Sequence, residues 1–309
     1  MRVIYPKKQK KNNMLSVTKT SKYWFLISGV LIVLSAIALI FWGLKPGIDF
    51  IGGSIMEIQG KGVTVVTVRQ SLEKAGQSDT EIQNTANNSV QIRLRLLSPD
   101  DHTKLLESLK KDLKNLDELR FDTVGPTFSR DLLNKSVTAI VLACVAILVY
   151  LAFVFRKSGS VVSSWAFGSF AVLALVHDVI VICGFFAIYA HFFGASADSL
   201  FITAILTVIG FSVHDTIVIF NRIKSNLRLY RMPFSDLVDQ SVIETFTRSI
   251  NTTVTTFLVL LALLYFGGST TRAFVATLCA GMIVGSYSSM FVAAPLLVLW
   301  QGRKAKTKR

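Results

Sequence analysis

Long apolar runs separated by polar segments dominate this chain of 309 residues. The hydrocarbon core of a bilayer is about 30 Å thick, so a helix needs about 20 mainly apolar residues to cross it. Six runs meet that length. They cover residues 24–43, 135–155, 163–188, 200–221, 249–267 and 274–300. The pattern predicts a membrane protein with six transmembrane helices.

The polar segment between the first and second runs has a different periodicity. Alternating apolar and polar residues predict strands, and apolar residues three and four apart predict helices. The expected strands are residues 54–59, 80–84, 90–96 and 118–124, and the expected helices cover residues 65–75 and 98–116. The order β-α-β-β-α-β predicts a small α+β domain of the ferredoxin-like type, a split βαβ unit.

The second of these helices has a clear start. Ser98 is suited to cap it and Pro99 to occupy its first position. Its buried face is expected to run from Leu105 through Leu109 to Leu116. We expect His102, in its first turn, to be a solvated surface residue.

Lys and Arg set the expected orientation, because short loops rich in them stay in the cytoplasm. Basic residues gather before the first run, around residues 156–157 and 222–231, and after residue 300. The loops at 191–199 and 267–273 hold one Arg between them. We therefore expect both termini in the cytoplasm and the α+β domain on the exocytoplasmic side.

This topology divides the chain into five parts. They are a basic cytoplasmic tail (1–23), a first transmembrane helix (24–43), an exocytoplasmic α+β domain (44–134), a bundle of five transmembrane helices (135–300) and a basic cytoplasmic tail (301–309). The first helix is long for a cleaved signal peptide, and Lys45-Pro46-Gly47 is a poor cleavage site, so we expect an uncleaved anchor.

The net charge of +14 is concentrated in the cytoplasmic tails and loops, since positive and negative residues nearly balance within 45–134. Anionic lipid headgroups explain this distribution better than a nucleic acid does. Cys144, Cys183 and Cys279 lie within apolar runs, and their spacing indicates neither a disulfide nor a metal site. No cofactor is expected, and the α+β domain has no pairing of nucleophile and base, so binding suits it better than catalysis.

Ionisable residues within the runs are the candidates for function, because a charge in hydrocarbon is costly. Asp178 and Asp215 lie near the middle of the third and fourth runs, and Arg248 begins the fifth. Burial favours the protonated form of a carboxyl group and a nearby arginine favours its charged form. Moving one relative to the other would switch proton affinity, which is a proton relay in outline. Arg248 could instead extend to the cytoplasmic interface.

Other polar residues accompany these charges. His177 and His214 precede the two aspartates, and Asn251 and Thr252 begin a polar stripe in the fifth run that can line a wet path or contact another helix. A metal site is disfavoured, because adjacent helical residues point about 100° apart. An aspartic-protease dyad is disfavoured by the different depths of the two acids.

In the sixth run, Gly281 and Gly285 have the spacing of small residues that allow close helix packing. That packing could be within this chain or with a partner.

Several motifs together resemble the SecF family. They are Gly47-Ile48-Asp49-Phe50-Ile51-Gly52-Gly53, Val124-Gly125-Pro126, His177-Asp178, the segment 207–220, Thr247-Arg248-Ser249-Ile250-Asn251-Thr252 and Gly285-Ser286-Tyr287-Ser288-Ser289. The resemblance runs from about residue 24 to residue 300. It implies the fold of the resistance-nodulation-division superfamily and a multi-pass protein of the bacterial cytoplasmic membrane, a translocase subunit rather than an enzyme.

The resemblance also implies roles and partners. Asp215 matches the proton-carrying aspartate of the family, Arg248 its partner arginine, and Asp49, beside Gly52 and Gly53, the acidic residue at the domain entrance. The implied partners are SecD, the SecYEG channel, an unfolded secreted protein and, as a further candidate, YajC. With SecD, the chain would use the proton motive force to promote protein export.

Two positions depart from the family pattern, and one rival function remains. Where the family commonly has Asn and Asp, this chain has His214 and Asn221. A titratable His beside the relay could shift its pH response. The rival is a proton-coupled exporter of small molecules or lipids, although such exporters usually carry two repeats in one longer chain. An intramembrane protease is disfavoured because Val213-His214 precedes Asp215 in place of Gly-x-Gly.

Overall fold

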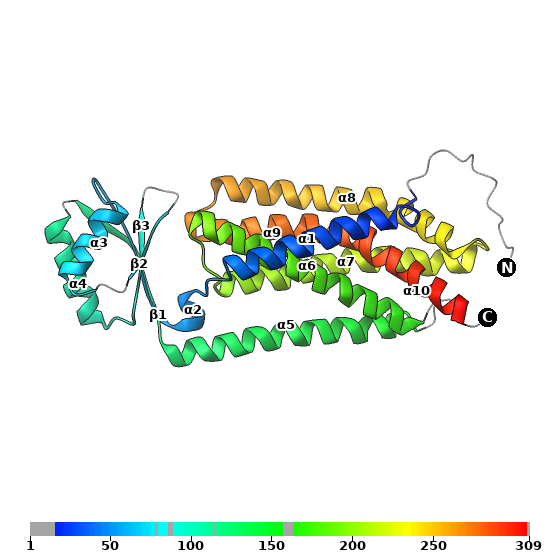
Figure 1. Cartoon of the computed structure of the whole chain (residues 1–309), viewed down its shortest axis with the longest axis horizontal. Coiled ribbons are helices and arrows are strands. Elements are labelled where there is room, and N and C mark those ends of the chain that lie inside the picture. Colours follow the sequence, from blue (N-terminus) through cyan, green and yellow to red (C-terminus); the bar gives the residue numbers. More distant parts are fainter. Residues whose placement is uncertain (1–15, 78–79, 86–88, 114, 157–162, 308–309) are drawn as a thin grey trace.

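The computed structural model describes residues 16–77, 80–85, 89–113, 115–156 and 163–307. A small domain built on a β-sheet stands at one end of a bundle of long helices (Figure 1). The first turn of α1 and the whole of α10 lie at the opposite end of that bundle (Figure 1). Most of the expected N-terminal basic tail, Lys157 and the last two residues lie outside the described residues.

The sheet domain, residues 53–124, contains four strands and two helices in the order predicted from the sequence. They are β1 (Gly53–Gly60), α3 (Val65–Lys74), β2 (Glu81–Asn84), β3 (Val90–Leu94), α4 (Pro99–Asp112) and β4 (Leu116–Val124). The strands lie in the order β2-β3-β1-β4, and every neighbouring pair is antiparallel.

Alternation along the strands explains why one face of this sheet is buried. Met56 of β1 is opposite Ile92 of β3 and Phe121 of β4, so apolar side chains share one face. Leu72 of α3 and Leu109 of α4 are fully buried in the same core. The two helices therefore cover the apolar face, and the domain has a core separate from that of the bundle.

Helix α4 confirms the predicted start and corrects two expectations. Ser98 Oγ accepts a hydrogen bond from Asp101 N, and Pro99 occupies the first turn. Leu116 lies in β4 and not on the helix, because Asn115 takes a left-handed conformation (φ 60°) just before it. His102 is partly buried and not a free surface residue: its Nε2 lies 2.7 Å from Glu118 Oε1 and its ring stacks on Phe121.

Six helical segments are long and apolar enough to cross a membrane, as predicted. Five are single helices, α1 (Ser21–Phe41), α5 (Pro126–Val154), α6 (Ser164–Phe193), α7 (Ser199–Leu229) and α8 (Phe234–Phe266). The sixth combines α9 (Ser269–Ser288), the π-helical turn η1 (Ser289–Ala293) and α10 (Ala294–Thr307). Most of these helical segments are longer than the apolar runs of the sequence. The hydrogen bonds of the helix backbone can continue where the side chains become polar.

The π-helical turn has a local cause. Pro295 lies two residues after it and has no backbone N–H to donate to the preceding turn. A wider turn just before a proline relieves the ring clash and often lies at a functional site. Ser288 and Ser289 are fully buried at its start.

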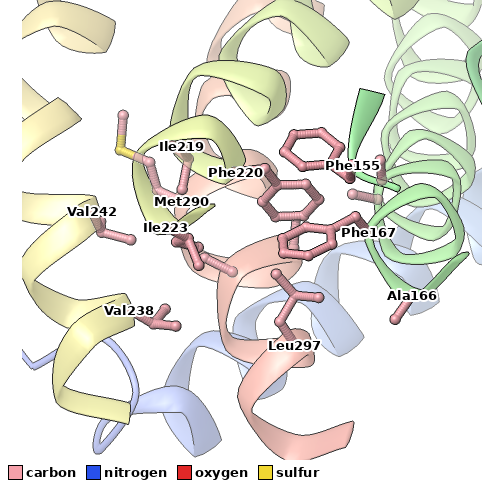
Figure 2. Packing of buried hydrophobic residues seen from close by; sticks show 14 of the residues in the cluster. Phe155, Ala166, Phe167, Ile219, Phe220, Ile223, Val238, Val242, Met290 and Leu297 are labelled. Carbon is pink, nitrogen blue, oxygen red and sulfur yellow. The ribbon is translucent and has the colours of Figure 1, made fainter. Parts of the chain in front are cut away.

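Apolar packing joins the helices at the end of the bundle away from the sheet domain. Phe155, Phe167 and Phe220 meet there, from the end of α5 and from α6 and α7 (Figure 2). The rings of Phe155 and Phe167 stack with centroids 4.7 Å apart, and Phe220 meets Phe167 edge-on at 5.2 Å. Met290 and Leu297 complete this core from η1 and α10.

The six spans are not equally buried. About half of each apolar window is buried in α6, in α7 and in the sixth segment, whereas the share is 17% in α1, 11% in α5 and 6% in α8. The first group therefore forms the interior of the bundle, and the second turns much apolar surface outward. That surface suits contact with lipid or with another membrane protein.

Candidate functional site

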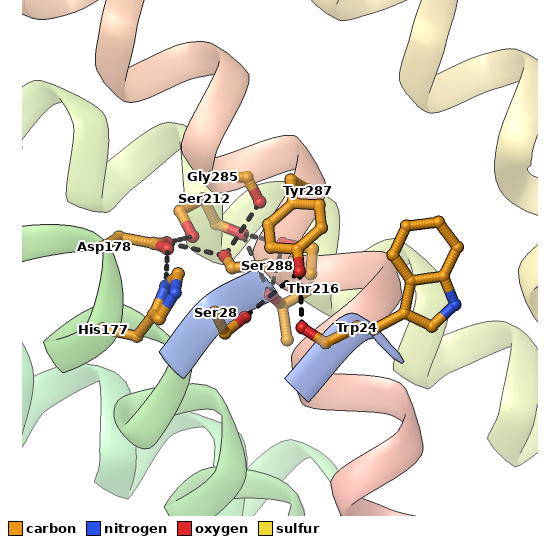
Figure 3. Close-up of polar contacts among 10 residues, drawn as sticks. Trp24, Ser28, His177, Asp178, Ser212, Thr216, Gly285, Tyr287 and Ser288 are labelled. Atoms are coloured by element: carbon orange, nitrogen blue, oxygen red, sulfur yellow. Dashed lines mark hydrogen bonds and ion pairs between the residues drawn. The ribbon is translucent and has the colours of Figure 1, made fainter. Parts of the chain in front are cut away.

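Asp178 of α6 is sealed within the bundle. Ser212 Oγ of α7 and Ser288 Oγ of α9 donate to its Oδ2 over 2.6 and 2.8 Å, as Figure 3 shows. His177 Nδ1 lies 3.0 Å from Oδ1, although the two residues are adjacent on a helix. Asp178 is only 1% exposed. Its carboxyl group thus joins three helices by hydrogen bonds.

Asp215 of α7 lies in a more open setting. Ser286 Oγ of α9 donates to its Oδ2 over 3.2 Å, and His214 Nδ1 lies 3.8 Å from Oδ1. Ser249 of α8 is buried near this carboxyl group, and its hydroxyl makes no hydrogen bond to any of the described residues. Asp215 is 7% exposed, and the His214 side chain is 54% exposed.

A small polar cleft between α7, α8 and α9 borders Asp215. Its lining includes His214, Thr252, Thr253 and Ser286, and the hydroxyls of Thr253 and Ser286 lie 2.5 Å apart. Hydroxyl groups in such a cleft can exchange hydrogen bonds with a carboxyl group in either protonation state. The arrangement therefore permits Asp215 to gain and lose a proton, whereas Asp178 is almost completely buried and does not line this cleft.

Arg248 of α8 does not pair with Asp215 in this structure. It is exposed and lines an open groove of about 640 Å³ between α7 and α8, together with Asn221, Arg222 and Glu244. No ion pair or hydrogen bond joins the Arg248 guanidinium to any of the described residues. The two expected relay residues are therefore not paired: Asp215 borders the cleft, and Arg248 borders the groove.

The other predicted residues of α8 differ in position. Thr252 lines the Asp215 cleft, and its Oγ1 donates to the Arg248 carbonyl over 3.0 Å. Asn251 is exposed on the outer surface, where its carbonyl accepts from Thr255 Oγ1 over 2.8 Å. The polar stripe is thus shared between the cleft and the outside of the bundle.

Small residues bring α9 against α7 at the level of the two aspartates. A Cβ atom at Gly281 would lie 2.3 Å from Val208 Cγ2, and one at Gly285 would lie 3.0 Å from Ser212 Cβ. The predicted small-residue packing is therefore within this chain. It places Ser286 beside Asp215 and Ser288 beside Asp178.

Serines that sequence reasoning did not connect with the acids complete the site. Ser212 serves Asp178, while Thr216 Oγ1 and Ser289 Oγ lie 2.8 Å apart one turn further on. Tyr287 Oη donates to the Trp24 carbonyl of α1 over 2.8 Å (Figure 3). The signal in the sequence was the run of hydroxyl residues after Gly285, but it does not say which acid each one meets.

Asp49 joins the segment after α1 to the start of α7. It lies in α2 (Ile48–Ile51), and its Oδ2 accepts from Ser199 N over 2.9 Å and from Ser199 Oγ over 2.6 Å. Backbone bonds from Ala197 N to Lys45 O and from Gly47 N to Ala197 O strengthen this junction. The Asp49 carboxylate therefore satisfies an end of the helix that carries Asp215.

The two glycines that follow are required by the backbone. Gly52 has φ 79° and Gly53 has φ 128°, and a Cβ atom at Gly53 would lie 2.8 Å from the Leu94 carbonyl. Only glycine adopts such angles without strain. Gly52 and Gly53 thus let the chain turn from the membrane junction directly into β1.

Asp198 stands beside Asp49 at the same helix end. Its Oδ1 accepts from Phe201 N over 2.9 Å, which makes it the N-cap of α7. Burial raises the pKa of Asp198, and the nearby charge of Asp49 raises it further, against the hydrogen bond from Phe201 N. Two acids thus share one helix N-terminus. Among the described residues, no group of three His, Cys, Asp or Glu side chains could hold a metal ion.

Comparisons with known proteins agree on one family. Residues 104–303 match the family described as protein export membrane protein SecD/SecF, C-terminal, and residues 37–61 match the SecD/SecF GG motif. The chain is 41% identical to the protein translocase subunit SecF of Thermobaculum terrenum, over 94% of this chain and 95% of that one. It is 35% identical to SecF of Anaerolinea thermophila, over 93% and 94%.

Solved structures of SecDF are also similar. The crystal structure of SecDF, a translocon-associated membrane protein from Thermus thermophilus, gives a TM-score of 0.83 at 30% identity and covers 97% of this chain. SecDF in its super-membrane-facing form gives a TM-score of 0.68. The chain spans 40% of the length of each SecDF chain. With six candidate spans, a small antiparallel sheet and these relatives, the chain is a multi-pass membrane protein that belongs to the SecF family of protein translocase subunits.

Proposed function

We propose that this chain is the SecF-type auxiliary subunit of the Sec protein translocase, that it acts with SecD, and that Asp215 carries protons to drive export. The observation that carries the proposal is the Asp215 cleft, where a nearly buried acid in the middle of a membrane helix borders hydroxyl groups of α8 and α9. An acid so placed is costly unless it has a function. The relatives are named translocase subunits, so the exporter alternative is not retained.

Asp215 and Arg248 form the relay in this proposal. Arg248 approaches Asp215 when the acid is charged and withdraws into the groove when the acid is protonated. Thr252 and His214 line the cleft beside the acid, and Asp178, sealed by its serines, holds α6, α7 and α9 in register. Asn251 faces outward on α8 and contacts a helix of SecD.

The sheet domain is ferredoxin-like and exocytoplasmic, and both termini are cytoplasmic in a bacterial cytoplasmic membrane. Its element order and antiparallel strand order support the first point, and the basic loops support the second. In this proposal, the five parts of the chain, divided after residues 23, 43, 134 and 300, meet where the chain enters or leaves the membrane and not where helices begin or end. The domain binds unfolded secreted protein beside the SecYEG channel, with YajC as a further partner and with lipid around α1, α5 and α8.

Affinity isolation in mild detergent tests the proposed assembly. A tagged chain should recover SecD and the channel, and recovery of neither would contradict the assignment. For orientation, Ser108→Cys on exposed α4 should react with an impermeant thiol reagent from outside, whereas Ser225→Cys should react only in opened cells. Both variants need a background without the three native cysteines.

Secretion into membrane vesicles tests the relay. Asp215→Asn should lose the stimulation that an uncoupler abolishes in the wild type, because an amide cannot carry a proton. Arg248→Lys should keep partial activity and Arg248→Met none, since the cation is what the acid requires. Equal activity of Arg248→Met and wild type would remove Arg248 from the relay.

A further inference from the structure

The position of Arg248 raises the question of what balances its charge. Three charged residues line the groove between α7 and α8, namely Arg222, Glu244 and Arg248, and no other charged residue of the described chain lines it. Arg248 has no hydrogen-bonded or ion-paired partner there, and a cation within a membrane span needs one. Among the described residues that line the groove, Glu244 is the only anion.

Glu244 is held by donors from both helices. Its Oε2 accepts from Arg222 Nε over 2.5 Å and from Asn226 Nδ2 over 2.9 Å, and its Oε1 accepts from Gln240 Nε2 over 2.8 Å. Asn226 is fully buried and also donates to Ser241 Oγ, which fixes it between α7 and α8. The carboxylate therefore keeps its position even if one of its donors leaves.

The spacing on α8 places Arg248 one turn beyond Glu244. Residues four apart lie on the same face of a helix, and Glu before a basic residue is the favourable order. On the other side of Arg248, Ser249 is buried beside Asp215. Along α8, Arg248 thus lies between Glu244, on the wall of an open groove, and Ser249, beside the carboxyl group of Asp215.

We propose that Glu244 is the second counter-ion of Arg248, which pairs with Glu244 while Asp215 is protonated and with Asp215 when that acid loses its proton to water. Arg222 competes for Glu244 and so sets how readily Arg248 leaves it. Glu244 is a positioning residue in this scheme, since it acts on the relay through Arg248. The inference rests on the proposed role of Asp215 and adds Glu244 as the group that competes with Asp215 for Arg248.

The pH dependence of proton-driven secretion in vesicles that contain SecD tests this inference, and the two neighbours should act in opposite directions. In Glu244→Gln, Arg248 stays with Asp215 and stabilises its charged form. The pH on the sheet-domain side at which activity is half-maximal should therefore fall by about one unit. In Arg222→Gln, Glu244 attracts Arg248 more strongly, so the shift should be to higher pH. Glu107→Gln on the exposed face of α4 should match the wild type.

Glu244→Asp keeps the charge and should restore most of the wild-type profile. If Glu244→Gln fails to accumulate in the membrane, the Arg222→Gln shift decides the question. Unshifted profiles for both variants, with Asp215→Asn inactive, would overturn the role of Glu244 alone. An Asp215→Asn protein with the full proton response would instead overturn the proposed function.

Discussion

Asp178 and Asp215 are aspartates on neighbouring membrane helices, each directly preceded by a histidine, yet their surroundings differ. Asp178 is sealed by hydroxyls from two other helices and by His177. Asp215 has one serine donor and borders a polar cleft between three helices. The comparison teaches that the hydrogen-bond donors around an acid in a membrane helix decide whether it is sealed, and in our proposal that difference separates a structural acid from a proton carrier.

The largest expected effect comes from removing the sealed acid. Asp178→Ala should lower the free energy of unfolding by about 3 kcal/mol or more, because two buried serine hydroxyls and His177 lose their acceptor. Thermal unfolding in detergent measures it, with Asp236→Ala, an exposed acid at the start of α8, as the control. Equal melting temperatures for the two variants would show that Asp178 does not hold the helices together.

The close contact between α7 and α9 lies at the level of the two aspartates. The stability of the chain should be sensitive to one added methyl group at this contact. Gly281→Ala should cost about 1–3 kcal/mol, because the added Cβ would overlap Val208. Gly210→Ala is the matched control, since a Cβ atom there meets nothing within 4 Å. If both variants melt like the wild type, the helices must tolerate a wider separation than the structure indicates.

The helix start below the sheet domain offers a pH-dependent prediction. Because burial and Asp49 raise the pKa of Asp198, its ionisation destabilises the folded chain, so wild-type stability should fall as pH rises from about 4 through the raised pKa. Asp198→Asn keeps the cap and removes that charge. The variant should melt higher than the wild type at pH 7, and the difference should vanish below pH 4. A variant that is less stable at neutral pH would contradict this account.

The smallest expected effect concerns His214, the exposed histidine beside Asp215. His214→Asn should keep secretion activity and shift its pH dependence slightly, because His214 Nδ1 is 3.8 Å from Asp215 and its ring is half exposed. His191→Asn, on α6 outside the cleft, is the control. An inactive His214→Asn protein would give this histidine a direct part in the relay.

The six candidate membrane helices and the order of elements in the sheet domain could be predicted because hydropathy and alternation are local properties of the sequence. The end of α4 was predicted wrongly at Leu116, since the apolar spacing continues past Asn115, whose backbone turns the chain into β4. His102 was predicted wrongly because its partners Glu118 and Phe121 come from a strand.

The site was predicted only in part for a similar reason. The sequence identifies both acids, but which of them is sealed depends on where Ser212, Ser286 and Ser288 point. The direction of Arg248 depends on how α8 is rotated against α7, which no spacing within α8 determines. A role for Glu244 could not be predicted, because the sequence does not distinguish an acid near the end of a membrane span from an ordinary surface residue.

The most direct test compares the two aspartates in one assay. Asp178→Asn and Asp215→Asn should be incorporated with SecD into vesicles, and secretion should be measured with and without an uncoupler. Each carried proton is worth about 2.3 kcal/mol per 100 mV, so the loss of one should be measurable. The account predicts that Asp178→Asn still responds to the uncoupler and that Asp215→Asn no longer does. An Asp215→Asn protein that responds as the wild type does, with Asp178→Asn unresponsive, would contradict the assignment of proton transfer to the open site.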